Sequence, residues 1–452
     1  MSKEPKKPSI DLINKTTHLM HDGMDAIAFG EFEIPPALGD ARWTDELILS
    51  TWHMAATGKV PENLNYKTGD SNGGFDKLEF KYISEKDWIE NSDEIETGIP
   101  LNRRGDERAK LNPPIPIYGG GMSYGSVSVN VMMARAMNAK KWNTYMSTGE
   151  GGYPEELYQC KEHVITQVAT GYFGVEERSI QAAPIVEFKY AQGAKPGLGG
   201  HLLASKAGEE VAKMRGSVPF VSLFSPFPFH STYSVEDHSK HIDWIQTVNP
   251  NALISVKVST PHDVDMVAVG SYYAGAHIIH LDGGFGGTGA APEIAKKNIA
   301  MPIELAIPKV HKFLIKEGIR DKVTLIASGG IRTGDDIAKA IALGADGVVL
   351  GTSDLVAMGC TRCSNCEGGP SGRGCPWGLT TTDIELQEWI QQEWAIKRLD
   401  NYYTAIQWRI RDILSKLGLD DVKKLVGRTD LLKQVSRGTS NLDDLDLSPL
   451  LV

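Results

Sequence analysis

The sequence predicts an α/β protein of the (β/α)8 TIM-barrel class, with an N-terminal extension and a C-terminal helical tail. From about residue 115 onward, short apolar runs rich in β-branched residues alternate with helical stretches, as in repeated strand–helix units around a parallel sheet. We count eight such runs, the number of strands in this barrel. Glycine-rich and polar motifs stand at the ends of the runs, where barrel enzymes build their active sites. An open doubly wound sheet would instead concentrate such motifs at its switch point.

The eight predicted strands follow one another through the middle of the chain. They are IPIYGG (115–120), NTYMST (143–148), IVEFKYA (185–191), FVSLFS (220–225), LISVKV (253–258), HIIHLDG (277–283), VTLIAS (323–328) and GVVLGT (347–352). Residues 106–380 are therefore predicted to form the barrel. Residues 1–105 lack this rhythm and are expected to pack on the barrel or on a partner. Within residues 381–452, apolar residues at spacings of three and four predict an amphipathic helix.

Composition and charge favour a soluble, cytoplasmic protein. Hydrophobic residues make up 41% and charged residues 23% of the chain, and no run of about 18 apolar residues offers a membrane span. The net charge of -10 argues against a nucleic-acid binder, because phosphate recognition rewards a basic surface. The amino terminus contains lysines but lacks the apolar core of a secretory signal.

Glycines at the ends of the last two predicted strands indicate a phosphate site. Gly329 and Gly330 follow one strand, and Gly351 and Thr352 follow the next, so backbone amides and a hydroxyl would meet at the barrel mouth. The simpler alternative is that these glycines only turn the chain. Arg332 is either a further phosphate ligand or a solvated arginine.

Polar residues at other strand ends are candidates for contacts with the rest of a phosphate-bearing cofactor. Lys257 ends the fifth run, where a buried ammonium is costly unless it meets an anion or a dipole. Beside a flavin, it would stabilise the negative charge that develops on the ring during reduction. Gln167 is a candidate for the same ring edge, although an amide in a turn is common. Asp282, in the motif DGGFGGTG, is a further candidate cofactor ligand.

Charged residues near the remaining strand ends suggest a site for an amine and a dicarboxylate. Glu150 lies among glycines in STGEGG, where it could orient an amine or transfer a proton, or instead cap the next helix. Lys195, in QGAKPG, and Arg215, in KMRGSV, are placed to bind a dicarboxylate, for which arginine offers a bidentate grip. A lone arginine on a helix is otherwise usually solvated.

Four of the five cysteines lie close together after the eighth predicted strand. They read Cys360-x2-Cys363-x2-Cys366-x8-Cys375-Pro376. This spacing suits an iron-sulfur cluster, whereas structural zinc usually has a paired second knuckle. A cluster at this position would lie within electron-transfer reach of a flavin in the barrel mouth. Cys160 stands apart and is expected to be a small buried residue.

Taken together, these motifs resemble the FMN domain of the glutamate synthase large subunit. GMSYGSVS, STGEGG, QVATGYFGV, AQGAKPGLGG, LISVKV, DGGFGGTGAAP, SGGIRTG and the cysteine run agree with that family in order and spacing. The resemblance runs from about residue 111 to 425. It implies that FMN and an iron-sulfur cluster are the cofactors, and that glutamate or 2-oxoglutarate is a substrate.

The resemblance also implies roles for individual residues. Met122, Ser123 and Glu150 would line the flavin and 2-oxoglutarate site, and Gln167 and Lys257 would contact the flavin. Lys195 would be catalytic together with Glu150, and Arg215 would bind the substrate.

Two departures from the family bear on substrate and cluster. His201 stands where many bacterial members have a substrate-contacting glutamine, so substrate details are expected to differ. The three cluster cysteines of the family correspond to Cys360, Cys366 and Cys375. Because Cys363 is additional, a 3Fe-4S and a 4Fe-4S cluster both remain open.

Parts of the full-length family enzyme are missing from the sequence. Residue 2 is Ser2, so the amino-terminal cysteine nucleophile of a glutaminase domain is absent, as is the C-terminal β-helix. We therefore expect one subunit of a split hetero-oligomeric enzyme, with amidotransferase-like and β-helix-like partner subunits.

Among split members of the family, the architecture of the chain most resembles the FMN subunit of N-methylglutamate synthase, also called methylamine-glutamate N-methyltransferase. That enzyme converts methylamine and L-glutamate to N-methyl-L-glutamate and ammonia. The alternative is a glutamate synthase subunit that reduces 2-iminoglutarate to L-glutamate. A second alternative is a non-catalytic scaffold that carries the cofactors while its partners perform the chemistry.

Overall fold

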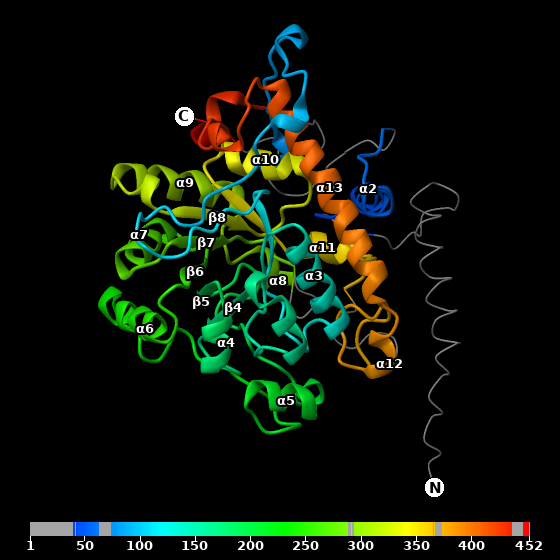
Figure 1. The fold of residues 1–452 in the computed structure, drawn as a ribbon, viewed down its shortest axis with the longest axis vertical. Coiled ribbons are helices and arrows are strands. Elements are labelled where there is room, and N and C mark those ends of the chain that lie inside the picture. Colours follow the sequence, from blue (N-terminus) through cyan, green and yellow to red (C-terminus); the bar gives the residue numbers. More distant parts are fainter. Residues whose placement is uncertain are drawn as a thin grey trace.

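The computed structural model contains a closed barrel of eight parallel strands surrounded by helices, which confirms the predicted fold class (Figure 1). The structure describes residues 39–40, 42–62, 74–287, 291, 293–364, 366, 373–435 and 446–451. In barrel order the strands are β2 (Ile117–Gly119), β3 (Met146–Ser147), β4 (Val164–Ala169), β5 (Ile185–Lys189), β6 (Leu253–Ser259), β7 (Ile278–Asp282), β8 (Thr324–Ser328) and β9 (Gly347–Leu350). Strand β9 pairs with β2 and closes the barrel. Every strand residue is buried, inward or against the helices.

The prediction of one of the eight strands is wrong, because that segment forms a loop. The eighth strand of the barrel is instead β4, which was not among the predicted strands. FVSLFS (220–225) is a loop that makes a single antiparallel bridge, between Leu202 and Leu223. It is preceded by Pro219 and followed by Pro226, and Phe220 has a φ of 59°, so a regular strand cannot form there. In β4, two polar residues interrupt the apolar pattern, yet all six positions are buried.

Helices return the chain between strands and cover the outside of the barrel. They are α3 (Val129–Lys141), α4 (Glu177–Ala182), α6 (Val235–Val248), α7 (Val264–Ala274), α9 (Ile303–Lys316), α10 (Gly334–Ala342) and α11 (Thr352–Ala357). The 3-10 helix η4 (Glu155–His163) connects β3 to β4. Two short helices, α5 (Glu209–Arg215) and α8 (Glu293–Lys297), lie in the loops after β5 and β7. Within the described part of the chain, no helix is long and apolar enough to cross a membrane.

The predicted helical tail contains α12 (Ile384–Gln387) and the 25-residue helix α13 (Gln392–Lys416). Buried residues of α13 recur at spacings of three and four, as the amphipathic pattern predicts; they include Ala395, Leu399, Tyr402, Ile406 and Ile410. This face packs on α3 and α10.

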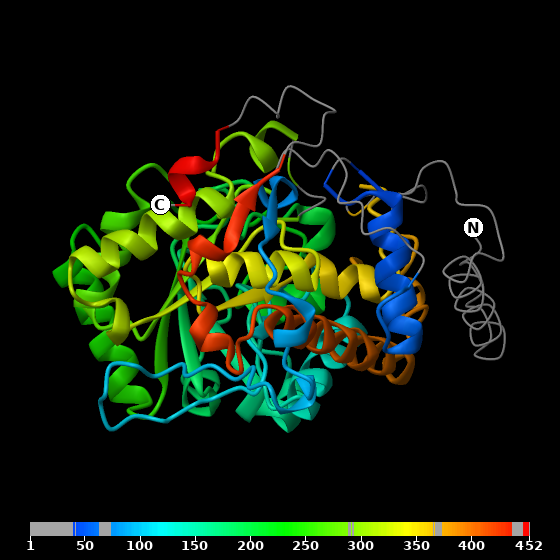
Figure 2. The ribbon, with the colours of Figure 1, turned by 90° about the horizontal axis from the view of Figure 1, so that it is seen from above.

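Segments that precede the barrel in the sequence pack against segments that follow it. Helix α2 (Asp45–Thr57) packs against α13 (Figure 1), and β1 (Leu78–Phe80) pairs antiparallel with β10 (Leu432–Gln434) (Figure 2). The first 38 residues of the predicted extension lie outside the described residues. The division into 1–105, 106–380 and 381–452 stays a prediction, but the extension and the tail contact each other as well as the barrel.

Candidate active site

Two adjoining cavities lie among the loops at the carboxyl-terminal ends of the barrel strands. Their volumes are about 220 Å³ for the first and about 140 Å³ for the second, and both are lined by Gly121, Met122 and Thr352. Because they share these walls, the two cavities form one compartment at the barrel mouth.

All the predicted site residues except Arg332 line this compartment. The first cavity is lined by Met122, Ser123, Glu150, Gln167, Lys195, His201, Arg215, Thr352, Cys360, Cys363, Cys366 and Cys375. The second cavity is lined by Met122, Lys257, Asp282, Gly329, Gly330, Gly351 and Thr352. The structure therefore brings them together, while their roles stay predictions. The last residues of the DGGFGGTG motif lie outside the described residues.

Glycine backbone forms one end of the second cavity. Gly329 and Gly330 have φ values of 108° and 74°, a region that favours glycine. A Cβ on Gly330 would lie 2.7 Å from the Cβ of Phe285, so a side chain there would collide with its neighbour. A Cβ on Gly351 would meet no atom within 4 Å, which leaves its backbone open to the cavity. Bare backbone facing an open space fits the predicted phosphate site.

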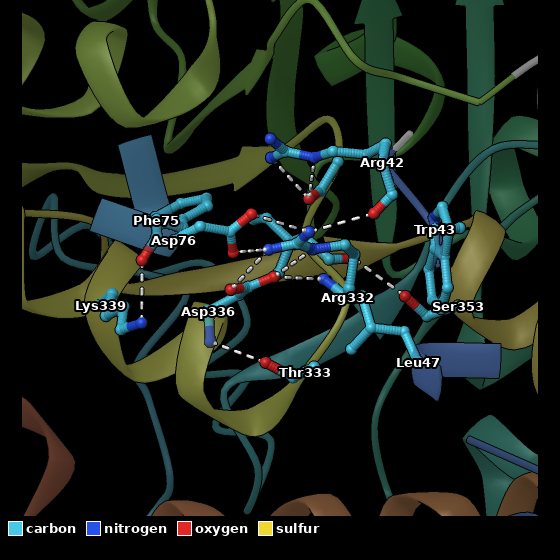
Figure 3. Close-up of polar contacts among 12 residues, drawn as sticks. Arg42, Trp43, Leu47, Phe75, Asp76, Arg332, Thr333, Asp336, Lys339 and Ser353 are labelled. Atoms are coloured by element: carbon cyan, nitrogen blue, oxygen red, sulfur yellow. Dashed lines mark hydrogen bonds and ion pairs between the residues drawn. The ribbon is translucent and has the colours of Figure 1, made fainter. Parts of the chain in front are cut away.

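Arg332 lines neither cavity, and both sequence-based interpretations of it are wrong. It is fully buried and pairs with Asp76 at 2.6 Å and with Asp336 at 2.8 Å (Figure 3). Burial would lower the pKa of Arg332, but the two carboxylates raise it. It ties the glycine turn to α10 and to the N-terminal extension instead of binding a ligand.

Arg42 of the N-terminal extension is the arginine that contacts the glycine turn (Figure 3). Its Nε and Nη2 donate to the Gly330 carbonyl at 3.1 and 2.8 Å, and its guanidinium carbon lies 4.6 Å from the centre of the Phe285 ring. The next residue, Trp43, lines the second cavity. No motif in the extension marks these residues, so the sequence did not reveal them.

The buried ammonium group of Lys257 forms an ion pair with a carboxylate, as its position requires. Its Nζ lies 3.2 Å from Oδ2 of Asp282 on the neighbouring strand. Burial would lower the pKa of Lys257, but the Asp282 and Glu187 carboxylates raise it. Burial would raise the pKa of Asp282, but the Lys257 and His280 charges and a hydrogen bond from Ser328 lower it to about 2. The second cavity is thus lined by a charged lysine–aspartate pair.

Gln167 belongs to a buried polar network inside the barrel, centred on Glu187. Its Nε2 donates to Oε1 of Glu187 at 2.7 Å, while Ser255 donates to Oε2 at 3.0 Å and Nδ1 of His280 lies 2.9 Å from Oε2. Burial would raise the pKa of Glu187, but His280, Lys257 and the Gln167 hydrogen bond lower it to about 2. The sequence analysis missed Glu187 and His280.

Glu150 is paired with a lysine. Nζ of Lys189, at the end of β5, donates to Oε1 of Glu150 at 2.5 Å and to Oε1 of Gln192 at 2.6 Å. The Lys189 and Glu150 side chains are only 8% and 11% exposed. The alternative role of Glu150 as a helix cap is wrong, because Pro154 occupies the N-cap of η4. Lys189, which lines both cavities, is a further site residue that the sequence analysis missed.

Arg215 closes the other side of the first cavity. It is the last residue of α5 and is 4% exposed, so the solvated alternative is wrong. Its Nη1 donates to the Gly200 carbonyl at 3.2 Å, and its Nη2 donates to the Ser123 hydroxyl at 3.3 Å. Burial lowers the pKa of Arg215, and Glu150 opposes this shift.

Two more predicted residues complete the rim of the first cavity. Lys195 has a φ of 47°, and its backbone N–H donates to the Ala295 carbonyl at 2.9 Å. Nε2 of His201 lies 3.3 Å from the Ser225 carbonyl. Both residues belong to the long loop after β5, so this loop supplies part of the rim.

The four clustered cysteines are free thiols on the first cavity. Burial raises the pKa of the Cys360 thiol to about 12. Arg362, between the first two cysteines, pairs with Asp40 of the extension at 2.7 Å. Among the described residues, no three His, Cys, Asp or Glu side chains are arranged to hold a metal ion, so the iron-sulfur cluster stays a prediction. Cys160 is buried, as predicted.

Solved structures share the fold of this chain at low sequence identity. The recombinant flavin-binding domain of baker's yeast flavocytochrome b2 has a TM-score of 0.51 and 15% identity, with 93% of each chain covered. A mutant flavocytochrome b2 with pyruvate bound has a TM-score of 0.51 and 12% identity, with 94% of this chain and 95% of that chain covered. These similarities support the barrel fold alone.

Relatives identified by sequence similarity indicate the family of the chain as well as its fold. The archaeal glutamate synthase [NADPH] of Archaeoglobus fulgidus is 38% identical, over 83% of this chain and 70% of the relative. The archaeal-type glutamate synthase [NADPH] of Dehalococcoides mccartyi is 36% identical, over 89% and 83%. The glutamate synthase [NADPH] large chain of Azospirillum brasilense is 37% identical over 73% of this chain, but the match spans only 22% of that longer protein.

A family model described as the conserved region in glutamate synthase matches residues 79–420. This match covers the whole barrel and all of α13, and it includes every predicted site residue. The chain therefore belongs to the glutamate synthase family.

Proposed function

We propose that this chain is the FMN-binding subunit of a glutamate synthase that reduces 2-iminoglutarate to L-glutamate. The observation that carries the proposal is the shared compartment, where a glycine-lined end and a buried Lys257–Asp282 pair adjoin a cavity lined by Glu150, Lys189 and Arg215. The names of the relatives support glutamate synthase, the alternative interpretation of the sequence, rather than N-methylglutamate synthase.

The lining of the second cavity supports a role in binding FMN, which would extend into the adjoining first cavity. Gly329, Gly330 and Gly351 would bind the phosphate through their backbone, and Lys257 would face the negative charge of the reduced ring. FMN supplies the hydride-transfer chemistry when it is bound. The buried position of Lys257 strengthens its electrostatic effect, because water does not screen it there.

The first cavity fits a dicarboxylate with a nitrogen at its reacting carbon. Arg215 and Lys195 would bind the carboxylates, and Arg215 is held in place by Gly200 and Ser123. The Glu150–Lys189 pair would hold and transfer the proton at the substrate nitrogen, because both side chains lie on the cavity wall and are nearly buried. Burial also excludes water that would hydrolyse an imine.

The cysteine loop is proposed to bind an iron-sulfur cluster that delivers electrons to the flavin. The support is the position of Cys360, Cys363, Cys366 and Cys375 on the same compartment. Iron and acid-labile sulfide analysis, with EPR spectra of anaerobically purified protein, would test it. Protein reconstituted with iron and sulfide that retains neither would contradict it.

We also propose that partner subunits complete the enzyme. The loop after β5 exposes large apolar side chains beside the first cavity, and exposed apolar surface of this kind often marks an interface. These side chains are Leu198, Leu203, Val218, Phe220, Val221, Phe224, Phe227 and Tyr233, which we call the rim patch. An amidotransferase-like subunit docked there could pass ammonia to the first cavity without loss to water.

The decisive experiment uses the reconstituted complex with FMN, 2-oxoglutarate, an ammonia source and a reductant. We expect L-glutamate to form, and we expect Glu150→Gln to lower kcat about 100-fold or more while FMN binding stays unchanged, since proton transfer contributes on the order of 10²–10⁴-fold. Glu155→Gln is the matched control, because Glu155 lies nearby on η4 but pairs with Arg178 on the surface. The same complex given glutamate and methylamine without a reductant separates the two enzymes. Formation of N-methylglutamate there, with no glutamate synthesis, would overturn the proposal.

A further inference from the structure

His280 lies in a layer of basic side chains inside the barrel. Lys257 is directly opposite Lys189 on β5 and His280 on β7, so the three residues occupy one level of the parallel sheet. Glu187 and Lys189 are two residues apart on β5 and therefore point to the same face, which the Glu187–His280 contact identifies as the inner face. His280 is 1% exposed, so its charge is set by protein groups rather than by solvent.

One ring nitrogen of His280 faces a carboxylate. Nδ1 lies 2.9 Å from Oε2 of Glu187, and Glu187 also accepts hydrogen bonds from Gln167 and Ser255. Hydrogen bonds to both oxygens favour the ionised form of Glu187, and an ionised carboxylate can only accept from the imidazole. Nδ1 must therefore carry a proton.

The other ring nitrogen faces the Ser328 hydroxyl, which donates its proton to a different acceptor. Nε2 of His280 lies 2.8 Å from Oγ of Ser328, and Ser328 donates to Oδ1 of Asp282 at 2.6 Å. A serine hydroxyl has one proton, so Ser328 can only accept from His280. Asp282 keeps its negative charge because its Oδ2 accepts from Gly193 at 2.9 Å and lies 3.2 Å from Nζ of Lys257. Nε2 must therefore carry a proton too.

The local charge balance leads to the same conclusion. Among the described residues, the charged groups that face His280 are Glu187 from β5, Lys257 from β6 and Asp282 from β7. Lys189 on the same level is paired with Glu150, so that pair adds no net charge. Tyr118 from β2 contributes only an aromatic contact, with ring centroids 6.4 Å apart. Two carboxylates and one lysine leave a net charge of about -1 in a buried site, which is costly. A positive His280 brings this group to neutrality.

We propose that His280 is held as an imidazolium ion and is a positioning residue for the flavin. It balances Glu187 and Asp282, so that the positive charge of Lys257 is directed at the ring in the second cavity. This role rests on the proposed FMN site, whereas the protonation state of His280 follows from the contacts inside the barrel. In the competing arrangement the proton lies on Asp282 and His280 is neutral, which would forfeit the Lys257–Asp282 attraction.

The first experiment measures the protonation state without flavin. In apo-protein labelled with ¹⁵N-histidine, we expect the two ring nitrogens of His280 to show the similar shifts of an imidazolium at pH 8. The resonances are assigned by their loss in His280→Gln. The widely split shifts of a neutral ring at pH 8 would overturn the proposal.

The second experiment measures the midpoint potential of bound FMN in His280→Gln, His280→Lys and the wild type. Loss of the positive charge in His280→Gln is expected to lower the potential, because the reduced ring is left with less compensation, and His280→Lys is expected to restore it in part. His262→Gln, at an exposed histidine, is the control and should leave the potential unchanged. An unchanged potential in His280→Gln would refute the positioning role.

These outcomes separate this inference from the proposed function. Wild-type protein that binds no FMN would refute the proposed function and the flavin role of His280, while the NMR measurement would still decide its protonation state. Should His280→Gln fail to fold, Ser328→Ala takes its place in the potential measurement. That variant removes the acceptor at Nε2 and is expected to shift the potential in the same direction.

Discussion

Replacing Arg42 by methionine tests whether the N-terminal extension is part of the phosphate site. Arg42 is 3% exposed and gives two hydrogen bonds to the Gly330 carbonyl, at 3.1 and 2.8 Å. A hydrogen bond from a charged group contributes about 1.5–3 kcal/mol, and because both bonds go to one oxygen we expect Arg42→Met to lower the free energy of unfolding by about 2–4 kcal/mol. Methionine keeps much of the apolar contact with the Phe285 ring, so the loss is mainly polar.

The same variant should weaken FMN binding. If the freed glycine turn must be ordered again by the ligand, about 1.4–2.8 kcal/mol of the loss reaches the binding equilibrium, which raises the dissociation constant about 10- to 100-fold. Quenching of flavin fluorescence measures the constant, and urea unfolding measures stability. Arg103→Met is the matched control, because Arg103 pairs at 2.9 Å with Asp346, which precedes β9 at the opposite end of the barrel. A wild-type FMN affinity in Arg42→Met, with stability lowered as in the control, would refute this reasoning.

Three further predictions concern the cluster, the barrel interior and the rim patch. Cys363→Ser is expected to keep the EPR signal of the cluster and Cys366→Ser to lose it; loss in both would show that Cys363 is a ligand. The folded pKa of Glu187, about 2, lies below its unfolded value near 4.5, so its contribution to stability is full above pH 4.5 and is lost as the pH falls toward 2. Glu187→Gln should therefore flatten acid unfolding over that range, and an unchanged slope would contradict the ionised state. Phe224, 72% exposed, should affect assembly, so Phe224→Asp is expected to weaken partner binding at least tenfold by calorimetry, whereas Ile315→Asp, at a position 56% exposed on α9, should not.

The barrel was predictable from the sequence because its strands are short apolar runs, each followed by a polar motif. The same rule failed where composition and burial diverge. The loop 220–225 is apolar but flanked by prolines, and Phe220, Val221 and Phe224 in it are exposed. Strand β4, in contrast, contains Thr166 and Gln167 but is buried throughout. A polar residue in a barrel strand can face inward to a partner, and no run of apolar residues reveals that.

The residues of the candidate site were predictable where a motif marks the end of a strand. Lys189 and Glu187 had a weaker signal, since they alternate with Val186 and Phe188 along β5, which places both charges on one face. No sequence signal marked Arg42, because it lies 288 residues before its partner Gly330 and no local pattern connects the two residues. The pairings of Glu150 with Lys189 and of Lys257 with Asp282 likewise join residues from different strands or strand ends, and only the closed barrel shows them.

The antiparallel pairing of β1 with β10 sets an order of events during synthesis. Strand β1 ends at Phe80 and its partner begins at Leu432, so the pair cannot form until the residues up to Gln434 have left the ribosome. Helix α2 must likewise wait for α13. The extension that carries Arg42 therefore docks late, after the barrel strands have emerged. The glycine turn at the barrel mouth therefore gains its contact with Arg42 only after the barrel strands, α13 and β10 have been synthesised.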